Sequence, residues 1–93
     1  MEERIKEAIA RAAAALKELG AREVFLFGSL GSGRAGTDSD VDLAVSGLPP
    51  EVFFRAMALA GDILGLKLDL VSLDEDNPFT RYLREEGELR RVD

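Results

Sequence analysis

Two short motifs in this chain have the residue types needed to hold a phosphate and a metal ion together. Gly28-Ser29 closes an apolar run, and ten residues later Asp40 and Asp42 open a second one. Because side chains alternate along a strand, Asp40 and Asp42 would point to the same face. Two carboxylates held this close repel each other unless a cation lies between them. The pattern therefore predicts a site for a divalent cation with hard oxygen ligands, most often Mg²⁺.

Three phosphate-loop patterns overlap at the glycines of this region. Residues 31–36 match G-x-G-x-x-G, but no helix of useful length follows before the next strand. Residues 28–34 resemble a Walker A loop without its Lys-Ser/Thr ending. The remaining pattern puts backbone N–H groups and a hydroxyl after a strand, where they can cradle phosphate oxygens. It also puts carboxylates on the adjacent strand, where they can hold the bridging cation.

Asp69 is the natural third carboxylate. It interrupts the apolar run 66–71, where a charge is costly unless it is paired or bound to a metal. If this run is a strand beside the one that holds Asp40 and Asp42, the three acids converge, and Asp69 can take the proton from an attacking hydroxyl. Each feature alone has an ordinary explanation, such as a solvated turn or an ion pair with Lys67. Their combination favours the site.

The elements that position these residues follow from hydrophobic periodicity and from capping residues. We expect helices over residues 2–19, 50–64 and 78–86, and strands over residues 23–27, 40–46 and 66–72. The loop between the first two strands is too short for a crossover helix, which predicts antiparallel neighbours. The order α-β-β-α-β-α in one domain, residues 1–93, predicts the α+β class: a small mixed β-sheet with helices packed on one face.

The amino-acid composition excludes several kinds of catalytic and binding site. The chain has 93 residues, no cysteine and no histidine, which excludes disulfides, thiolate sites and imidazole catalysis. The net charge of −6 argues against direct binding of a nucleic-acid backbone, although it permits a nucleotide held through a metal. The first residues carry acids and lack an apolar core, and no apolar run reaches membrane-spanning length. We therefore expect a cytoplasmic protein without a signal peptide or membrane contact.

The segments 27–29 and 39–45 together resemble the signature of the minimal nucleotidyltransferases of the DNA polymerase beta superfamily, and the resemblance extends over nearly the whole chain. It implies the polymerase-beta-like nucleotidyltransferase fold and roles for six residues. Gly28 and Ser29 would bind the nucleotide triphosphate, with Arg34 as the nearby cation, and Asp40, Asp42 and Asp69 would be the catalytic carboxylates that bind Mg²⁺.

The resemblance also implies a partner and a reaction. Minimal members resemble antitoxins that neutralise a HEPN-domain ribonuclease toxin by transferring AMP from ATP to one of its tyrosines. The chain departs from the family pattern at Leu30 and Ser32, where members commonly carry arginine. This departure favours an alternative, in which a weak or inactive antitoxin neutralises its toxin by stoichiometric binding. Transfer to a small molecule is disfavoured, because the chain lacks an acceptor-binding domain.

The middle helix is apolar almost all round, with Glu51, Arg55 and Asp62 as its only charges. A helix of this kind cannot bury its whole surface against one small sheet. One interpretation is that Phe54 and its neighbours contact a second chain. The other is that the N-terminal helix packs over this surface, and the sequence leaves both open.

Overall fold

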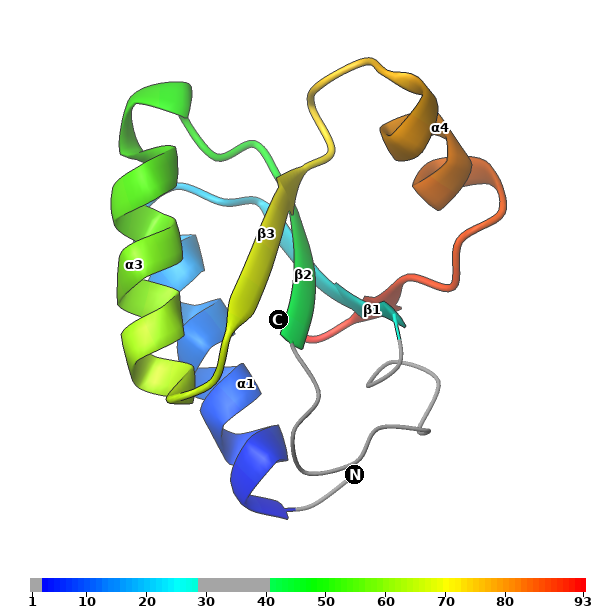
Figure 1. The fold of residues 1–93 in the computed structure, drawn as a ribbon. Coiled ribbons are helices and arrows are strands. Elements are labelled where there is room, and N and C mark those ends of the chain that lie inside the picture. The colour runs from blue at the N-terminus through cyan, green and yellow to red at the C-terminus, as the bar shows by residue number, and fades with distance from the viewer. Residues whose placement is uncertain (1–2, 29–40) are drawn as a thin grey trace.

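The computed structural model describes residues 3–28 and 41–93. Its strands form one sheet in the order β3-β2-β1-β4, with helices on either side (Figure 1). The elements are α1 (Glu3–Glu18), β1 (Glu23–Phe27), β2 (Val41–Ser46), the 3₁₀ turn η1 (Pro50–Val52), α3 (Phe53–Leu64), β3 (Leu68–Ser72), α4 (Pro78–Glu85) and β4 (Arg90–Arg91). This order confirms the predicted succession of helices and strands and adds the short β4 at the edge of the sheet.

The sheet is mixed, as predicted. β1 and β2 pair antiparallel with Phe27 opposite Asp42, whereas β2 and β3 pair parallel with Asp42 opposite Asp69. The parallel pair requires a crossover connection, and α3 provides it. β4 pairs antiparallel with the outer edge of β1. The neighbouring placement of β2 and β3 is therefore confirmed.

One face of the sheet is covered by α1 and α3, which lie together on one side of it in Figure 1. α1 presents a buried stripe at helical spacing, in which small alanines allow close approach of α3. The buried members of this core are Ala8, Ile9, Ala12, Ala13, Leu16, Ala21, Val24, Leu26, Val41, Leu43, Val45, Leu48, Ala56, Ala60, Leu64 and Leu70. This face provides most of the buried apolar surface that stabilises the fold.

The third helix, α4, packs on the opposite face (Figure 1). Its Leu83 joins Ala44 and Leu73 in a second cluster, against which Phe25 and Phe27 also pack. The sequence-based expectation of helices on one face therefore holds for α1 and α3 and not for α4. The physical reason is that β1 carries phenylalanines on its second face, and that face also needs an apolar cover.

The boundaries of two elements, the middle helix and β3, differ from the prediction. The helix expected over 50–64 begins with a 3₁₀ turn, closed by a hydrogen bond from Val52 N to Pro49 O of 3.1 Å. It ends at Gly65, whose φ of 65° is left-handed, as expected for this cap. β3 begins at Leu68, two residues later than predicted, and within the described ranges β2 begins at Val41. No helix of residues 3–28 or 41–93 is long and apolar enough to cross a membrane.

Candidate active site

Asp42 and Asp69 occupy directly paired positions on β2 and β3. The residues that flank them, including Leu43 and Leu70, point into the core beneath α1 and α3. Because side chains alternate along a strand, both carboxylates project from the opposite face, on the side of α4. Asp42 is half-buried and Asp69 is exposed. Two of the three predicted acids therefore lie on neighbouring strands, about 4.8 Å apart in backbone spacing, with their carboxylates on one face.

Gly28 lies directly against the Asp42 carboxylate of this pair. Its φ is +78°, and a Cβ built on it would overlap Oδ2 of Asp42 and lie 3.2 Å from Cγ. Glycine alone adopts this backbone conformation at little cost. It is also the only residue type that leaves the space that the Asp42 carboxylate fills. The residue after β1 and the Asp42 carboxylate of β2 are therefore in immediate contact.

The remaining predicted site residues, Ser29, Arg34 and Asp40, lie outside the described residues and stay predictions. Among the residues that the structure does describe, no three acidic, histidine or cysteine side chains converge on one point. Asp42 and Asp69 offer two carboxylates from adjacent strands, and hard oxygen donors of this kind suit Mg²⁺. The described part of the site fits the metal that the motif predicts.

Two aromatic side chains, Phe27 of β1 and Phe79 of α4, form an aromatic wall beside Asp42 on the side of β1. Phe27 faces Asp42 across the strands, and the ring of Phe79 meets it edge-on, with centroids 6.2 Å apart and planes at 61°. Phe79 and Tyr82 are three residues apart on α4, so they share one face of that helix. They line a cavity of about 360 Å³ together with Phe27, Gly28, Leu83, Glu86, Gly87 and Glu88. Sequence reasoning missed these residues, although their spacing on an amphipathic helix was a usable signal.

The C-terminal strand is fixed by Asp93, whose side chain is 2% exposed. Its carboxylate accepts hydrogen bonds from Arg91 Nε at 2.9 Å, Lys17 Nζ at 2.8 Å and Val24 N at 3.0 Å. The bond from Arg91 is the main reason that the pKa of the Asp93 carboxyl lies well below its usual value, and the bond from Lys17 adds to it. These contacts hold the tail of the chain against both α1 and β1.

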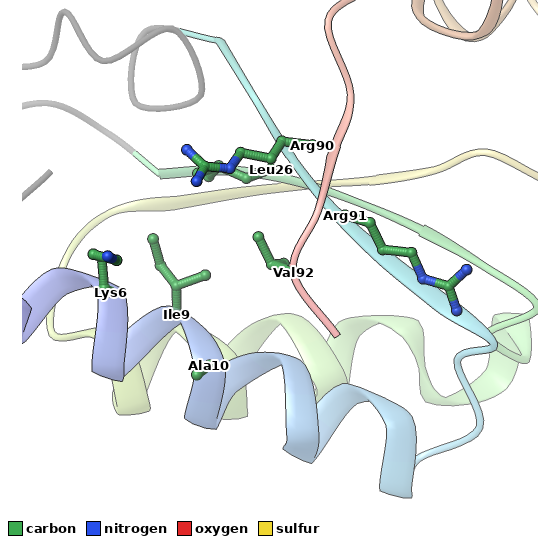
Figure 2. Close-up of a pocket in the computed structure, with 7 residues that line it drawn as sticks. All are labelled: Lys6, Ile9, Ala10, Leu26, Arg90, Arg91 and Val92. Carbon is green, nitrogen blue, oxygen red and sulfur yellow. The ribbon is translucent and has the colours of Figure 1, made fainter.

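A separate cavity of about 280 Å³ lies between α1 and the C-terminal strand (Figure 2). Lys6 and Ile9 reach it from α1, and Arg90 and Val92 reach it from the C-terminal segment. Leu26, which also lines it, belongs to the core beneath the helices. This cavity is therefore on the other face of the sheet from Asp42, and none of the described residues that line it carries a carboxylate. The carboxylates and the glycine turn, rather than this cavity, define the candidate active site.

Comparison with known proteins agrees with this geometry. The family model described as polymerase beta, nucleotidyltransferase matches residues 8–89. The fold also matches a structure assigned as a minimal nucleotidyltransferase, with a TM-score of 0.68 and 29% identity over 89% of this chain and 92% of that one. No curated protein is significantly similar to the chain in sequence.

Two further solved structures share the fold. One is a crystal structure of a toxin–antitoxin with AMP-PNP, with a TM-score of 0.71 and 19% identity over 95% of this chain and 72% of that one. The other is a crystal structure of the toxin–antitoxin MntA-HepT, with a TM-score of 0.67 and 16% identity over 95% of this chain and 71% of that one. Because the sequence identities are this low, these two comparisons show that the fold is shared and nothing more.

Proposed function

This chain belongs to the polymerase beta nucleotidyltransferase family, and on that premise we propose that it transfers AMP from ATP to a tyrosine of a HEPN-domain toxin. The observation that carries the proposal is the pairing of Asp42 with Asp69 on one face of the sheet, with Gly28 directly against the Asp42 carboxylate. A transferase of this class needs carboxylates beside a turn that can hold the triphosphate, and Asp42, Asp69 and Gly28 are consistent with the described part of such a site.

Each residue of the motif has a defined task in this proposal. Gly28 lets the backbone approach the phosphates closely, and Ser29 and Arg34 add a hydroxyl and a positive charge to hold them. Asp40, Asp42 and Asp69 would hold Mg²⁺, which when bound neutralises the phosphate charge and orients the leaving group.

The reaction is an in-line substitution at phosphorus. The hydroxyl oxygen of the acceptor tyrosine attacks the α-phosphorus of ATP and forms a new P–O bond. The bond from that phosphorus to the oxygen bridging the α- and β-phosphates breaks, and pyrophosphate leaves. The phenolic proton passes to the carboxylate of Asp69, which is exposed and can reach a hydroxyl that arrives from solvent. Asp42, half-buried against Gly28, stays in place to bind rather than to exchange protons.

A second chain must supply the acceptor, and α3 offers a surface for it. α1 covers the inner side of α3, where Ala56 and Ala60 are fully buried. The outer side carries exposed apolar side chains, with Phe54 79% and Leu59 41% exposed, beside the exposed charges of Arg55 and Asp62. Exposed apolar surface of this kind is typical of a contact site. Two structures that share the fold are toxin–antitoxin complexes, which supports a toxin as the partner.

Stoichiometric neutralisation is the alternative, and one observation favours it. Leu30 and Ser32 stand where the related nucleotidyltransferases commonly carry arginine, which removes two positive charges from the expected triphosphate site. In this alternative the outer face of α3 binds the toxin and the carboxylates play no part.

The two functions are separated by the mass of the cognate HEPN toxin after incubation with this chain, ATP and Mg²⁺. Transfer adds whole adenylate units to the toxin, and Asp42→Asn abolishes the addition. Glu18→Gln is the matched control, because Glu18 is an exposed acid at the end of α1, away from both the site and the outer side of α3. A toxin that is neutralised while its mass is unchanged would overturn the transfer proposal and support stoichiometric binding.

A further inference from the structure

The cavity between the end of β1 and α4 lies where the base of a bound nucleotide would extend from its phosphates. We propose that the nucleobase of the substrate enters this cavity and stacks on the side chains of Tyr82 and Phe79. This inference rests on the proposed function, since it assigns the base-binding part of the same site.

The position of the cavity is the first reason. Gly28 lines it, and the same Gly28 lies against the carboxylate of Asp42. A ligand whose phosphates are held at this turn therefore has its sugar and base within reach of the cavity. The volume of about 360 Å³ lies at the lower end of the range for small-molecule pockets, so it suits a ring system better than a larger ligand.

The exposed rings of α4 are the second reason. Phe79 is 49% and Tyr82 is 54% exposed, although both are large aromatic side chains on a helix whose Leu83 is buried. The edge contact with Phe27 fixes the ring of Phe79, so the wall is formed before a ligand arrives. Stacking on such side chains strengthens the binding of a base by roughly 5- to 150-fold.

The charges at the rim set the orientation of the ligand. Glu86 and Glu88 line the same cavity and are exposed. Their carboxylates repel the phosphates of a nucleotide, which therefore stay at the Gly28 end. An uncharged aromatic ring meets no such penalty. The cavity is thus suited to the base of a nucleotide and unsuited to its phosphates or to an acidic peptide.

α4 is held firmly enough to serve as one wall of this pocket. At its N-terminus, Thr80 N donates to Asn77 Oδ1 at 2.9 Å and Asn77 N donates to Thr80 Oγ1 at 3.1 Å, which forms a capping box. Near its C-terminus, Arg84 Nη2 donates to Leu73 O. The buried Leu83 anchors the middle of the helix against the sheet. The rings of Phe79 and Tyr82 are therefore presented from a preorganised element.

The test compares the binding of ATP with that of inorganic tripolyphosphate, both with Mg²⁺, by calorimetry on the isolated chain. Tyr82→Ala should weaken the binding of ATP by roughly tenfold and leave that of tripolyphosphate unchanged. Tyr82→Phe keeps the ring and should bind ATP like the wild type. Glu85→Ala is the control, because Glu85 is exposed on the same helix and does not line the cavity. Thermal unfolding of each variant confirms that the fold is intact.

The outcomes separate this inference from the function on which it rests. Equal ATP affinity in Tyr82→Ala and the wild type, with binding still lost in Asp42→Asn, would overturn the base pocket and leave the proposed function standing. An unchanged ATP affinity with a raised KM for the toxin would assign the pocket to the acceptor and likewise overturn the inference. A wild-type chain that binds neither ATP nor tripolyphosphate would overturn the proposed function itself.

Discussion

Replacing Gly28 by alanine tests the contact between the glycine turn and the carboxylate of Asp42. Two effects add in this variant. The backbone at Gly28 has a φ of +78°, a left-handed conformation that costs an L-residue about 1–2 kcal/mol. The new Cβ also overlaps Asp42 Oδ2, so the carboxylate must move by on the order of 1 Å, and displacements of that size in an active site can lower the rate about 100-fold.

The chain offers a matched control for the first effect alone. Gly65 also has a positive φ, +65°, but an added Cβ there meets no atom within 4 Å. Gly65→Ala should therefore destabilise the fold by about 1 kcal/mol and lower the midpoint of thermal unfolding by about 4–8 °C, without affecting catalysis. Gly28→Ala should show a similar loss of stability together with the loss of rate.

The assay measures the rate of adenylate addition to the toxin under single-turnover conditions, alongside the thermal unfolding of each variant. Comparing the two variants removes the contribution of backbone strain, since both carry it. If Gly28→Ala transfers adenylate as fast as Gly65→Ala, the Asp42 carboxylate does not need the position that Gly28 leaves open, and the geometric reasoning is wrong.

Three further predictions concern the scaffold. Asp93→Asn should lower the free energy of unfolding by about 1 kcal/mol at pH 7, because the carboxylate loses its charged hydrogen bonds. Folding lowers the pKa of this carboxyl, so its contribution to the free energy of unfolding is complete above the ordinary pKa of 3.8 and is lost as the pH falls below that value. The free energies of unfolding of the two proteins, measured by denaturant titration, should therefore converge as the pH falls below 3.8. Gly61→Ala should raise the free energy of unfolding by about 0.5–1 kcal/mol, because Gly61 lies within α3 and an added Cβ meets nothing within 4 Å; an unchanged or lower melting temperature would contradict this. Asn77→Ala should lower the free energy of unfolding by about 1 kcal/mol by removing the cap of α4, whereas Asn77→Asp retains an acceptor and should lose much less; equal losses in the two melting curves would argue against the cap.

The sequence was sufficient for the features that depend on local pattern. The alternation around Asp42 and Asp69 fixes the face on which each side chain lies, and the short loop after Gly28 favours an antiparallel return. These inferences needed only the period of the hydrophobic residues and the spacing of the motif. The helix between β2 and β3 allows a parallel pairing, but their placement as neighbours was only a condition at the level of sequence and comes from the structure.

The features that the sequence did not reveal depend on contacts between distant residues. Phe25 and Phe27 indicated a second apolar face, but no local signal says that α4 covers it. The pairing of the two-residue β4 with β1 is stabilised by Asp93, which binds Lys17 of α1 from the other end of the chain. The aromatic wall of Phe79 and Phe27 likewise forms only when α4 meets the end of β1.

The most direct measurement of the central claim is the binding of Mn²⁺, a spectroscopic substitute for Mg²⁺, in the presence of a non-hydrolysable ATP analogue. If Asp42 and Asp69 hold one metal–nucleotide complex, Asp42→Asn and Asp69→Asn each release the metal, and the double variant loses no more than either single one. Asp62→Asn, on the outer part of α3, should bind Mn²⁺ like the wild type. Undiminished metal binding in Asp69→Asn would contradict the claim that the two paired carboxylates form the active site.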